Sequence, residues 1–200
     1  ITKYGKTVNE ISDLELEELT NQKYNANDCI TDDCGVTYKN NPLVLLFKPY
    51  RRDIENYKIK EGTVAITNEA FYSNDIRISL KNILIPDSVI AIGESAFYRC
   101  RIGQLKLPAS LRYIGRYAFR LSKIKSISFP KNIQKIGSYA FARCEQLERI
   151  EFNGLPKSIG SEVFSGCTAL KEIVIPQGLS DFFEKELFPM SRELFIEKNS

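Results

Sequence analysis

The chain offers few of the side chains that enzymes use for chemistry. It has no histidine, so the commonest general base and the commonest metal ligand are both missing. It also lacks a serine elbow motif, a Gly-rich phosphate loop and a second metal-type cysteine pair. Adjacent carboxylates such as Asp32 and Asp33 alternate in direction, which makes a poor acid–base pair. We therefore expect no enzyme, with no catalytic residues, no metal and no cofactor.

The five cysteines are an odd number, which excludes a complete disulfide framework within one chain. Cys100, Cys144 and Cys167 share one position of a repeated pattern. We expect them to be buried thiols that act as small hydrophobes, with metal or disulfide chemistry as the alternative. Cys29 and Cys34 stand apart, and a local disulfide between them stays open. A zinc site there is disfavoured because no histidine accompanies the pair.

The charged side chains are distributed unevenly. The whole chain carries a net charge of only +3. Residues 95–144 nevertheless contain no Asp or Glu, and the flanking segments are net acidic. The window holds these basic residues: Arg99, Arg101, Lys106, Arg112, Arg116, Arg120, Lys123, Lys125, Lys131, Lys135 and Arg143. Such asymmetry indicates an anionic partner, against the alternative of an ordinary solvated surface.

The elements that must position these residues follow from an internal repeat. The pattern Ile-Pro, Ile-Gly, Ala-Phe and Cys recurs along the chain, with small variations. Its phenylalanines are 22, 22 and 23 residues apart, at Phe97, Phe119, Phe141 and Phe164. A fixed period of roughly 20 to 29 residues indicates a solenoid of stacked coils.

Each coil is expected to contain a strand, a turn and an inward aromatic side chain. Segments such as 105–107 alternate apolar and exposed residues, which is the period of a strand, and the proline that follows ends it. An inward isoleucine comes seven residues later, usually before a glycine that we interpret as a tight turn. The Ala-Phe pair then fills the interior. We expect one continuous aromatic stack of Phe71, Phe97, Phe119, Phe141 and Phe164.

These motifs resemble the BspA-like leucine-rich repeats, also called the Treponema pallidum type, over residues 57–178. The resemblance implies a right-handed leucine-rich repeat solenoid. It places the parallel β-sheet on the concave face and short strands and turns on the convex side. It also implies a secreted or cell-surface bacterial protein, commonly called adhesin-like, that binds host or bacterial macromolecules. The family has no catalytic residues or fixed binding motif to carry over.

The ends of the solenoid need caps, because terminal coils expose apolar interior and open strand edges. We divide the chain into an N-terminal capping segment (1–34), the repeats (35–178) and a C-terminal helical cap (179–200). Residues 35–47 look like a leading hairpin with its turn at Asn40 and Asn41. Ser180 is expected to cap the closing helix, whose apolar residues are Phe182, Phe183, Leu187 and Phe188.

The segment 13–20 receives no secondary-structure assignment. Its leucines, Leu14, Leu16 and Leu19, fit neither the helical nor the strand period cleanly.

Two surfaces are candidates for a ligand. The first is a basic belt around two coils, interleaved with tyrosines, where arginine forks suit sulfated, carboxylated or phosphate-bearing polymers. Its residues are Arg99, Arg112, Arg116, Arg120, Lys135, Arg143, Tyr113 and Tyr117. The second is the concave face, a mixed polar ladder on which Leu84 and Val174 are expected to be exposed. Its residues are Asn82, Leu84, Gln104, Lys106, Ser128, Arg149 and Glu151.

The function we predict is a non-enzymatic binding or adhesion module that recognises a host or bacterial surface protein or an anionic glycan. The alternative is a structural or assembly spacer with no soluble ligand. Nucleic acid is disfavoured because the acidic ends would repel a duplex. No apolar run is long enough to span a membrane. The chain begins at Ile1 without an apolar leader, which we interpret as a mature or truncated chain of a cell-surface or secreted protein.

Overall fold

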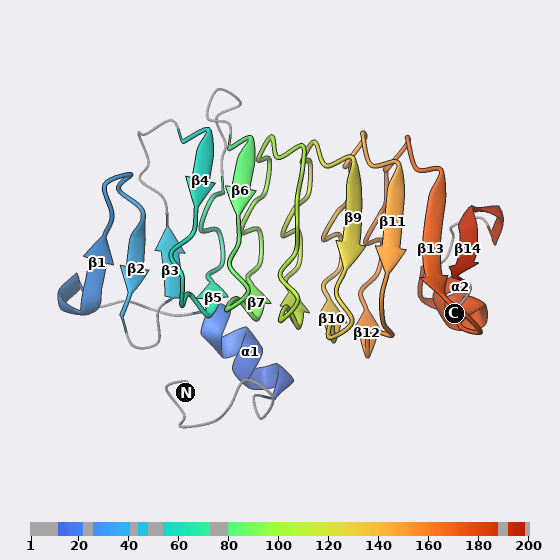
Figure 1. Cartoon of the computed structure of the whole chain (residues 1–200), viewed down its shortest axis with the longest axis horizontal. Coiled ribbons are helices and arrows are strands. Elements are labelled where there is room, and N and C mark those ends of the chain that lie inside the picture. The colour runs from blue at the N-terminus through green and yellow to red at the C-terminus, as the bar shows by residue number, and fades with distance from the viewer. Residues whose placement is uncertain are drawn as a thin grey trace.

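The computed structural model describes residues 12–21, 26–40, 44–47, 54–72, 80–187 and 192–198. The chain winds into a solenoid whose coils contribute longer strands to a front ladder and short strands to a second sheet (Figure 1). Equivalent residues of successive coils lie side by side, because the strands pair parallel and in register. The predicted solenoid fold is confirmed.

The front ladder is formed by the longer strands. It contains β4 (Asn56–Lys58), β6 (Asn82–Leu84), β9 (Ser126–Phe129), β11 (Arg149–Phe152), β13 (Glu172–Pro176) and β14 (Phe195–Lys198). It is interrupted at the coil of Leu105, where a single bridge joins Asn82 to Gln104. Strands β4 and β6 therefore pair separately from the parallel group β9, β11, β13 and β14.

The second sheet begins with a hairpin and continues with very short strands. Its members are β1 (Cys29–Thr31), β2 (Thr37–Lys39), β3 (Val44–Phe47), β5 (Ala65–Ile66), β7 (Ala91–Ile92), β8 (Tyr113–Ile114), β10 (Lys135–Ile136) and β12 (Ser158–Ile159). Strands β2 and β3 pair antiparallel, over the segment for which the sequence predicts a hairpin. From β3 onward every pairing is parallel. Asn41 lies outside the described residues.

The aromatic stack runs through the interior as predicted. Neighbouring rings from Phe71 to Phe141 are nearly parallel, with centroids 5.1–5.2 Å apart. Phe164 continues the stack at 5.8 Å. All five rings are at most 3% exposed. Large aromatic side chains in offset contact supply much of the burial energy of a core, so this column ties each coil to the next.

The glycine after each inward isoleucine has a different role from the one predicted. We expected a tight turn, but none of these glycines has a positive φ. A Cβ on Gly137 would instead lie 2.5 Å from the backbone nitrogen of Arg116, and one on Gly115 would lie 2.5 Å from that of Glu94. The glycine is needed because the backbones of adjacent coils touch there.

The cysteines of the repeat are buried thiols, and all five cysteines of the chain are thiols rather than disulfides. The Sγ atoms of Cys100, Cys144 and Cys167 donate to backbone carbonyls of the preceding coil at 3.2–3.3 Å. They therefore act as small hydrophobes, as expected. Each thiol also provides a hydrogen bond to one backbone carbonyl of the preceding coil. Cys34 is exposed in the turn after β1.

An N-terminal helix, α1 (Asp13–Thr20), lies against the second sheet beside β5, β7 and β8 (Figure 1). Ser12 and Glu15 form a capping box, in which the Ser12 hydroxyl accepts from the Glu15 N–H and the Glu15 carboxylate accepts from the Ser12 N–H. Leu16 and Leu19 are each 1% exposed and pack on the sheet, whereas Leu14 is 68% exposed. The sequence left this segment unassigned.

The C-terminal cap contains more than the predicted helix. Helix α2 (Ser180–Glu186) buries Phe183 against the last coil, and Leu187 is buried after it. Its N-cap is Leu179 rather than Ser180, and no side chain caps it. The chain then forms the short helix η3 (Arg192–Leu194) and returns as β14 beside β13. At the other end, the short helix η2 (Ala26–Asp28) precedes β1. Phe188 lies outside the described residues.

Candidate binding surfaces

The structure divides the predicted basic belt into two groups. Arg112, Tyr113 and Lys135 lie on the side that α1 covers. Lys135 forms an ion pair with Glu17 of α1. Tyr113 is half-buried against the helix, and burial together with Glu17 and Glu94 raises the pKa of its hydroxyl to about 12. Tyr113 and Lys135 are therefore engaged with α1, and the belt is not one continuous open surface.

Arg112 is only 6% exposed, and its Nη2 donates to Gln134 Oε1 at 2.9 Å. A guanidinium held in this way presents less of its charge to solvent than the sequence suggested. The sequence could not show this, because Gln134 belongs to the next coil.

The second group forms a tyrosine–arginine cluster on the turns that follow the second sheet. Two stacked tyrosine pairs frame it, Tyr72–Tyr98 at 5.1 Å and Tyr117–Tyr139 at 5.3 Å between centroids. The Arg120 guanidinium lies over both Tyr98 and Tyr117, at 5.9 and 5.3 Å from their centroids, and so joins the pairs. The cluster consists of Tyr72, Tyr98, Arg99, Arg116, Tyr117, Arg120 and Tyr139.

Two further arginines complete the cluster on its exposed side. Arg116 lies 4.5 Å from the Tyr117 centroid, and its Nη2 donates to the Tyr117 hydroxyl at 2.7 Å. Arg99 lies 5.6 Å from the Tyr98 centroid. Both are exposed, so the guanidinium edges can reach a ligand while their faces rest on the rings. Arg143 is also exposed, one coil further along.

Several of these side chains project from strained backbone. Arg99, Tyr117, Tyr139 and Arg143 have φ between 55° and 60°. Gly166 holds the position that corresponds to Arg143 in the next coil, with φ of 74°. Glu69, Ser95, Leu121 and Glu162 hold the same two coil positions and also have positive φ, so this backbone conformation belongs to the repeat rather than to the cluster.

The cluster has acidic residues at both ends. Glu69 and Glu162 hold the coil position that Tyr117 and Tyr139 occupy between them. The Tyr139 hydroxyl donates to Glu162 Oε1 at 2.7 Å, and this bond raises the pKa of Tyr139. The positive surface is thus limited to the middle coils.

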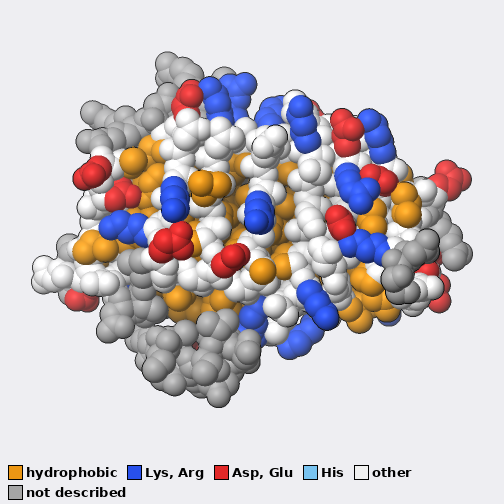
Figure 2. All heavy atoms as spheres, viewed as in Figure 1, with side chains coloured by type: hydrophobic (Ala, Val, Ile, Leu, Met, Phe, Trp, Pro, Cys, Tyr) orange, Lys and Arg blue, Asp and Glu red, His pale blue; other side chains and the backbone are white. Residues whose placement is uncertain are grey.

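On the predicted concave face, charges of both signs lie interspersed (Figure 2). Asn82 Nδ2 donates to Asn56 Oδ1 at 2.6 Å, and Leu84 is 64% exposed. Lys106 and Gln104 are exposed on the interrupted coil. Toward the C-terminus the charges are paired: Arg149 contacts Glu172 and Glu151, and Lys198 contacts Glu151. Ser128 accepts from Asn153 Nδ2 at 2.8 Å.

Val174 was expected to be exposed on this face, and that expectation was wrong. It is 6% exposed, because β14 adds a strand beside it and brings Ile196 into register with it. Sequence reasoning also omitted Tyr72 and Tyr98 from the cluster. Both follow a stacked phenylalanine directly, and this shared repeat position could have placed them together.

Within the described ranges, no three metal-ligating side chains converge. No helix in the same ranges is long and apolar enough to cross a membrane.

Comparison with known proteins identifies the family. Residues 64–194 match the model of the BspA type leucine rich repeat region, in 6 copies. The chain therefore belongs to the BspA-type leucine-rich repeat family. The matched range passes the predicted end of the repeats at residue 178 and includes α2 and η3. No curated protein matches the chain.

Among solved structures, the chain is similar to a leucine rich cell surface protein from Faecalibacterium prausnitzii A2-165. The identity is 28% and the TM-score 0.66, over 82% of this chain and 43% of that protein. A leucine-rich repeat protein from Bacteroides ovatus is 28% identical with a TM-score of 0.54, over 78% of this chain and 49% of that protein. The chain thus spans less than half the length of either relative.

A leucine rich repeat protein from T. pallidum shares the fold. Its identity to the chain is 24% and its TM-score 0.61, with 88% of this chain and 81% of that protein covered.

Proposed function

We propose that the chain is a non-catalytic binding module of a cell-surface or secreted protein, and that it recognises an anionic glycan through the tyrosine–arginine cluster. The observation that carries this proposal is the placement of Arg99 and Arg116. Each guanidinium lies on a tyrosine ring and is exposed. Apart from Arg116 Nη2, which donates to the Tyr117 hydroxyl, the guanidinium N–H groups can meet sulfate or carboxylate groups.

The location also supports the proposal. The relative from Faecalibacterium prausnitzii is described as a cell surface protein, and a module that binds a glycan suits that location. Localisation of this chain at the surface is part of the proposal.

The experiment compares binding of the chain to immobilised heparin and to uncharged dextran, at low and at physiological salt. We expect Arg116→Glu and Arg99→Glu each to weaken heparin binding about tenfold, because each removes a charge-assisted contact and adds repulsion. Lys106→Glu makes the same charge change on the front ladder and is the matched control, so it should leave most of the binding intact.

Two results would contradict the proposal. If no sulfated or sialylated glycan binds at low salt, the anionic-glycan function is wrong and the front ladder becomes the better candidate. If the chain binds no soluble ligand but self-associates, the spacer role is the better description.

A further inference from the structure

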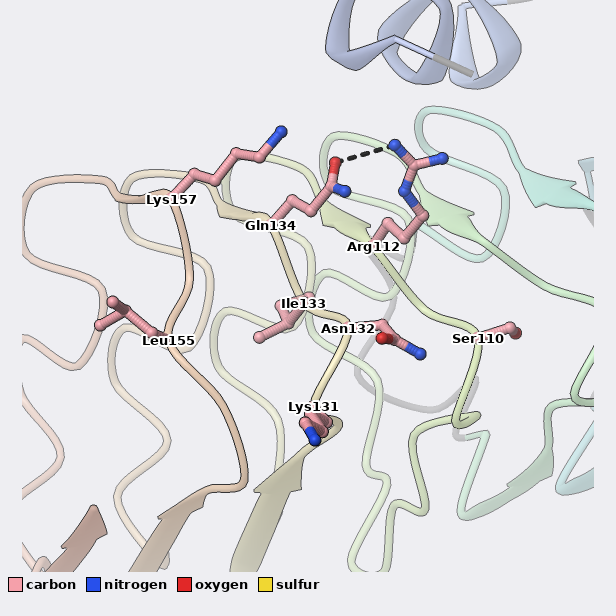
Figure 3. A pocket seen from close by; sticks show the side chains of 8 residues that line it. All are labelled: Ser110, Arg112, Lys131, Asn132, Ile133, Gln134, Leu155 and Lys157. Carbon is pink, nitrogen blue, oxygen red and sulfur yellow. Dashed lines mark hydrogen bonds between the residues drawn. The ribbon is translucent and has the colours of Figure 1, made fainter. Parts of the chain in front are cut away.

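A groove of about 490 Å³ crosses three coils on the side between the front ladder and the second sheet (Figure 3). The volume lies within the range of small-ligand sites. The groove is separate from the tyrosine–arginine cluster, which lies beyond the second sheet, and no residue is shared between them. Its lining is Ser110, Arg112, Lys131, Asn132, Ile133, Gln134, Leu155 and Lys157.

The rim of the groove is cationic. Arg112, Lys131 and Lys157 line it from three successive coils, with Arg112 only 6% exposed, and no acidic residue lines the groove. Lys131 and Lys157 are exposed, and neither has an ion-pair partner within the part of the chain that the structure describes. Not every polar group of the lining is available to a ligand, because the Ser110 hydroxyl already donates to the backbone oxygen of Val89 at 2.8 Å.

The floor of the groove is aliphatic. Ile133 is buried, and Leu155 beside it is 49% exposed. The parallel register places Leu155 at the coil position held by Asn132 and Ser110 in the two preceding coils. In this coil the buried residue at the inward position is Pro156, so a leucine stands where the repeat otherwise presents a polar side chain. An exposed leucine among cations fits a ligand with both apolar and anionic groups.

Helix α1 shows which chemistry this side of the solenoid accepts. It carries Asp13, Glu15, Glu17 and Glu18 with three leucines. It docks by placing Leu16 and Leu19 on an apolar patch and Glu17 on Lys135. That patch includes Ile90, whose equivalents in the next three coils are Arg112, Gln134 and Lys157. In Figure 3, α1 lies above the Arg112 end of the groove.

We propose that the groove is a docking site for an acidic peptide segment of a partner protein that carries an aliphatic side chain. The aliphatic group would rest on Leu155 and Ile133, and carboxylates would meet Lys131 and Lys157. The bound peptide would lie over the coils that contain β8, β10 and β12. It would extend the side of the solenoid on which α1 packs against β5, β7 and β8. This site and its ligand are independent of the glycan proposed above.

The test uses the whole chain and fluorescence anisotropy of short labelled peptides. The probe peptide contains glutamates and leucines between glycine and serine spacers. Two matched probes replace either all leucines by serine or all glutamates by glutamine. We expect only the first probe to bind well, with each matched probe about tenfold weaker, because both kinds of contact are needed.

Protein variants locate the site. Lys157→Glu and Leu155→Ser should each weaken the probe's affinity about five- to tenfold. Lys106→Glu and Arg116→Glu alter charge elsewhere and should leave it unchanged. Thermal unfolding followed by circular dichroism shows whether each variant is folded, and both groove substitutions are on exposed residues.

Three outcomes would overturn the proposal. The first is that no acidic leucine-bearing probe binds at physiological salt. The second is that Leu155→Ser leaves affinity unchanged while any charge reversal lowers it, which indicates nonspecific electrostatics. The third is that heparin binding, rather than peptide binding, is lost in Lys157→Glu, which assigns the groove to the glycan.

Discussion

Lys135 of β10 and Glu17 of α1 form an ion pair across 118 positions of sequence. Around this contact, Leu16 and Leu19 of the helix are buried on Ile90 and Ala91 of the sheet. Burial of a leucine side chain contributes about 1.5–3 kcal/mol, whereas a half-exposed ion pair contributes at most about 1 kcal/mol. The leucines therefore hold the helix, and the ion pair orients it.

The first prediction follows from that difference. Leu19→Ala should lower the free energy of unfolding by about 2–4 kcal/mol, because it leaves a cavity under α1. Glu17→Gln should lower it by less than about 1 kcal/mol. Chemical denaturation of both variants measures this. Equal losses would show that electrostatics hold the helix instead.

The second prediction concerns the contact between adjacent backbones. Gly137→Ala should destabilise the protein by about 3 kcal/mol, since its Cβ would lie 2.5 Å from the Arg116 nitrogen. Gly103 is the matched control, because a Cβ there meets nothing within 4 Å. Gly103→Ala should change the unfolding free energy by less than about 0.5 kcal/mol. Similar effects of the two substitutions would contradict the close approach.

The third prediction is that Ser122→Cys stabilises the protein. Ser122 is 1% exposed, and its hydroxyl has no hydrogen-bond partner within the described residues. An unsatisfied buried hydroxyl costs about 1–3 kcal/mol. Cysteine is the residue that Cys144 and Cys167 supply at this position, with a thiol bonded to a carbonyl. We expect a gain of roughly 1 kcal/mol in thermal or chemical unfolding, and a loss would refute the argument.

The fourth prediction concerns stability at high pH. Burial raises the pKa of the Cys167 thiol to about 11 from the ordinary value of 9.0. The unfolded thiol therefore ionises before the folded one, so stability is full below about pH 9 and falls between pH 9 and 11. Cys167→Ala should show a smaller loss in this window than the parent chain. Alkylation at pH 8 should label Cys34 long before Cys167.

The fifth prediction separates stability from binding. Arg99→Gly relieves a backbone with φ of 60°, so the free energy of unfolding should stay equal or rise by up to about 1 kcal/mol. The same substitution removes an exposed guanidinium, so heparin affinity should fall. Calorimetry and heparin binding on one preparation test both. A variant that is destabilised and binds normally would contradict the assignment of Arg99.

Features set within one repeat were readable from the sequence. The stack from Phe71 to Phe164 and the buried position of Cys144 follow from a period that places identical residues in register. The close approach at Gly137 was assigned to the right residue type for the wrong reason. Spacing shows that a side chain is excluded, but only three dimensions show whether a turn or a neighbouring coil excludes it.

Features that join distant segments were not readable. The hydrophobic pattern of α1 is weak, although Ser12 and Glu15 carry the capping-box signal that could have revealed the helix. The removal of Lys135 from the basic belt depends on Glu17, which lies outside the acid-free window. Likewise, the sequence could not show that Leu155 lines one groove with Lys131 and Lys157, because this depends on the register between coils.

Helix α1 changes how the solenoid would come apart under mechanical tension. A coil that touches only its two neighbours can peel away singly. The helix, however, lies across β5, β7 and β8 and reaches β10 through Lys135. A pull on the C-terminal end would therefore detach coils one at a time until it met the strapped ones, which must release together. The C-terminal coils would therefore unfold at lower force than the N-terminal coils that α1 joins.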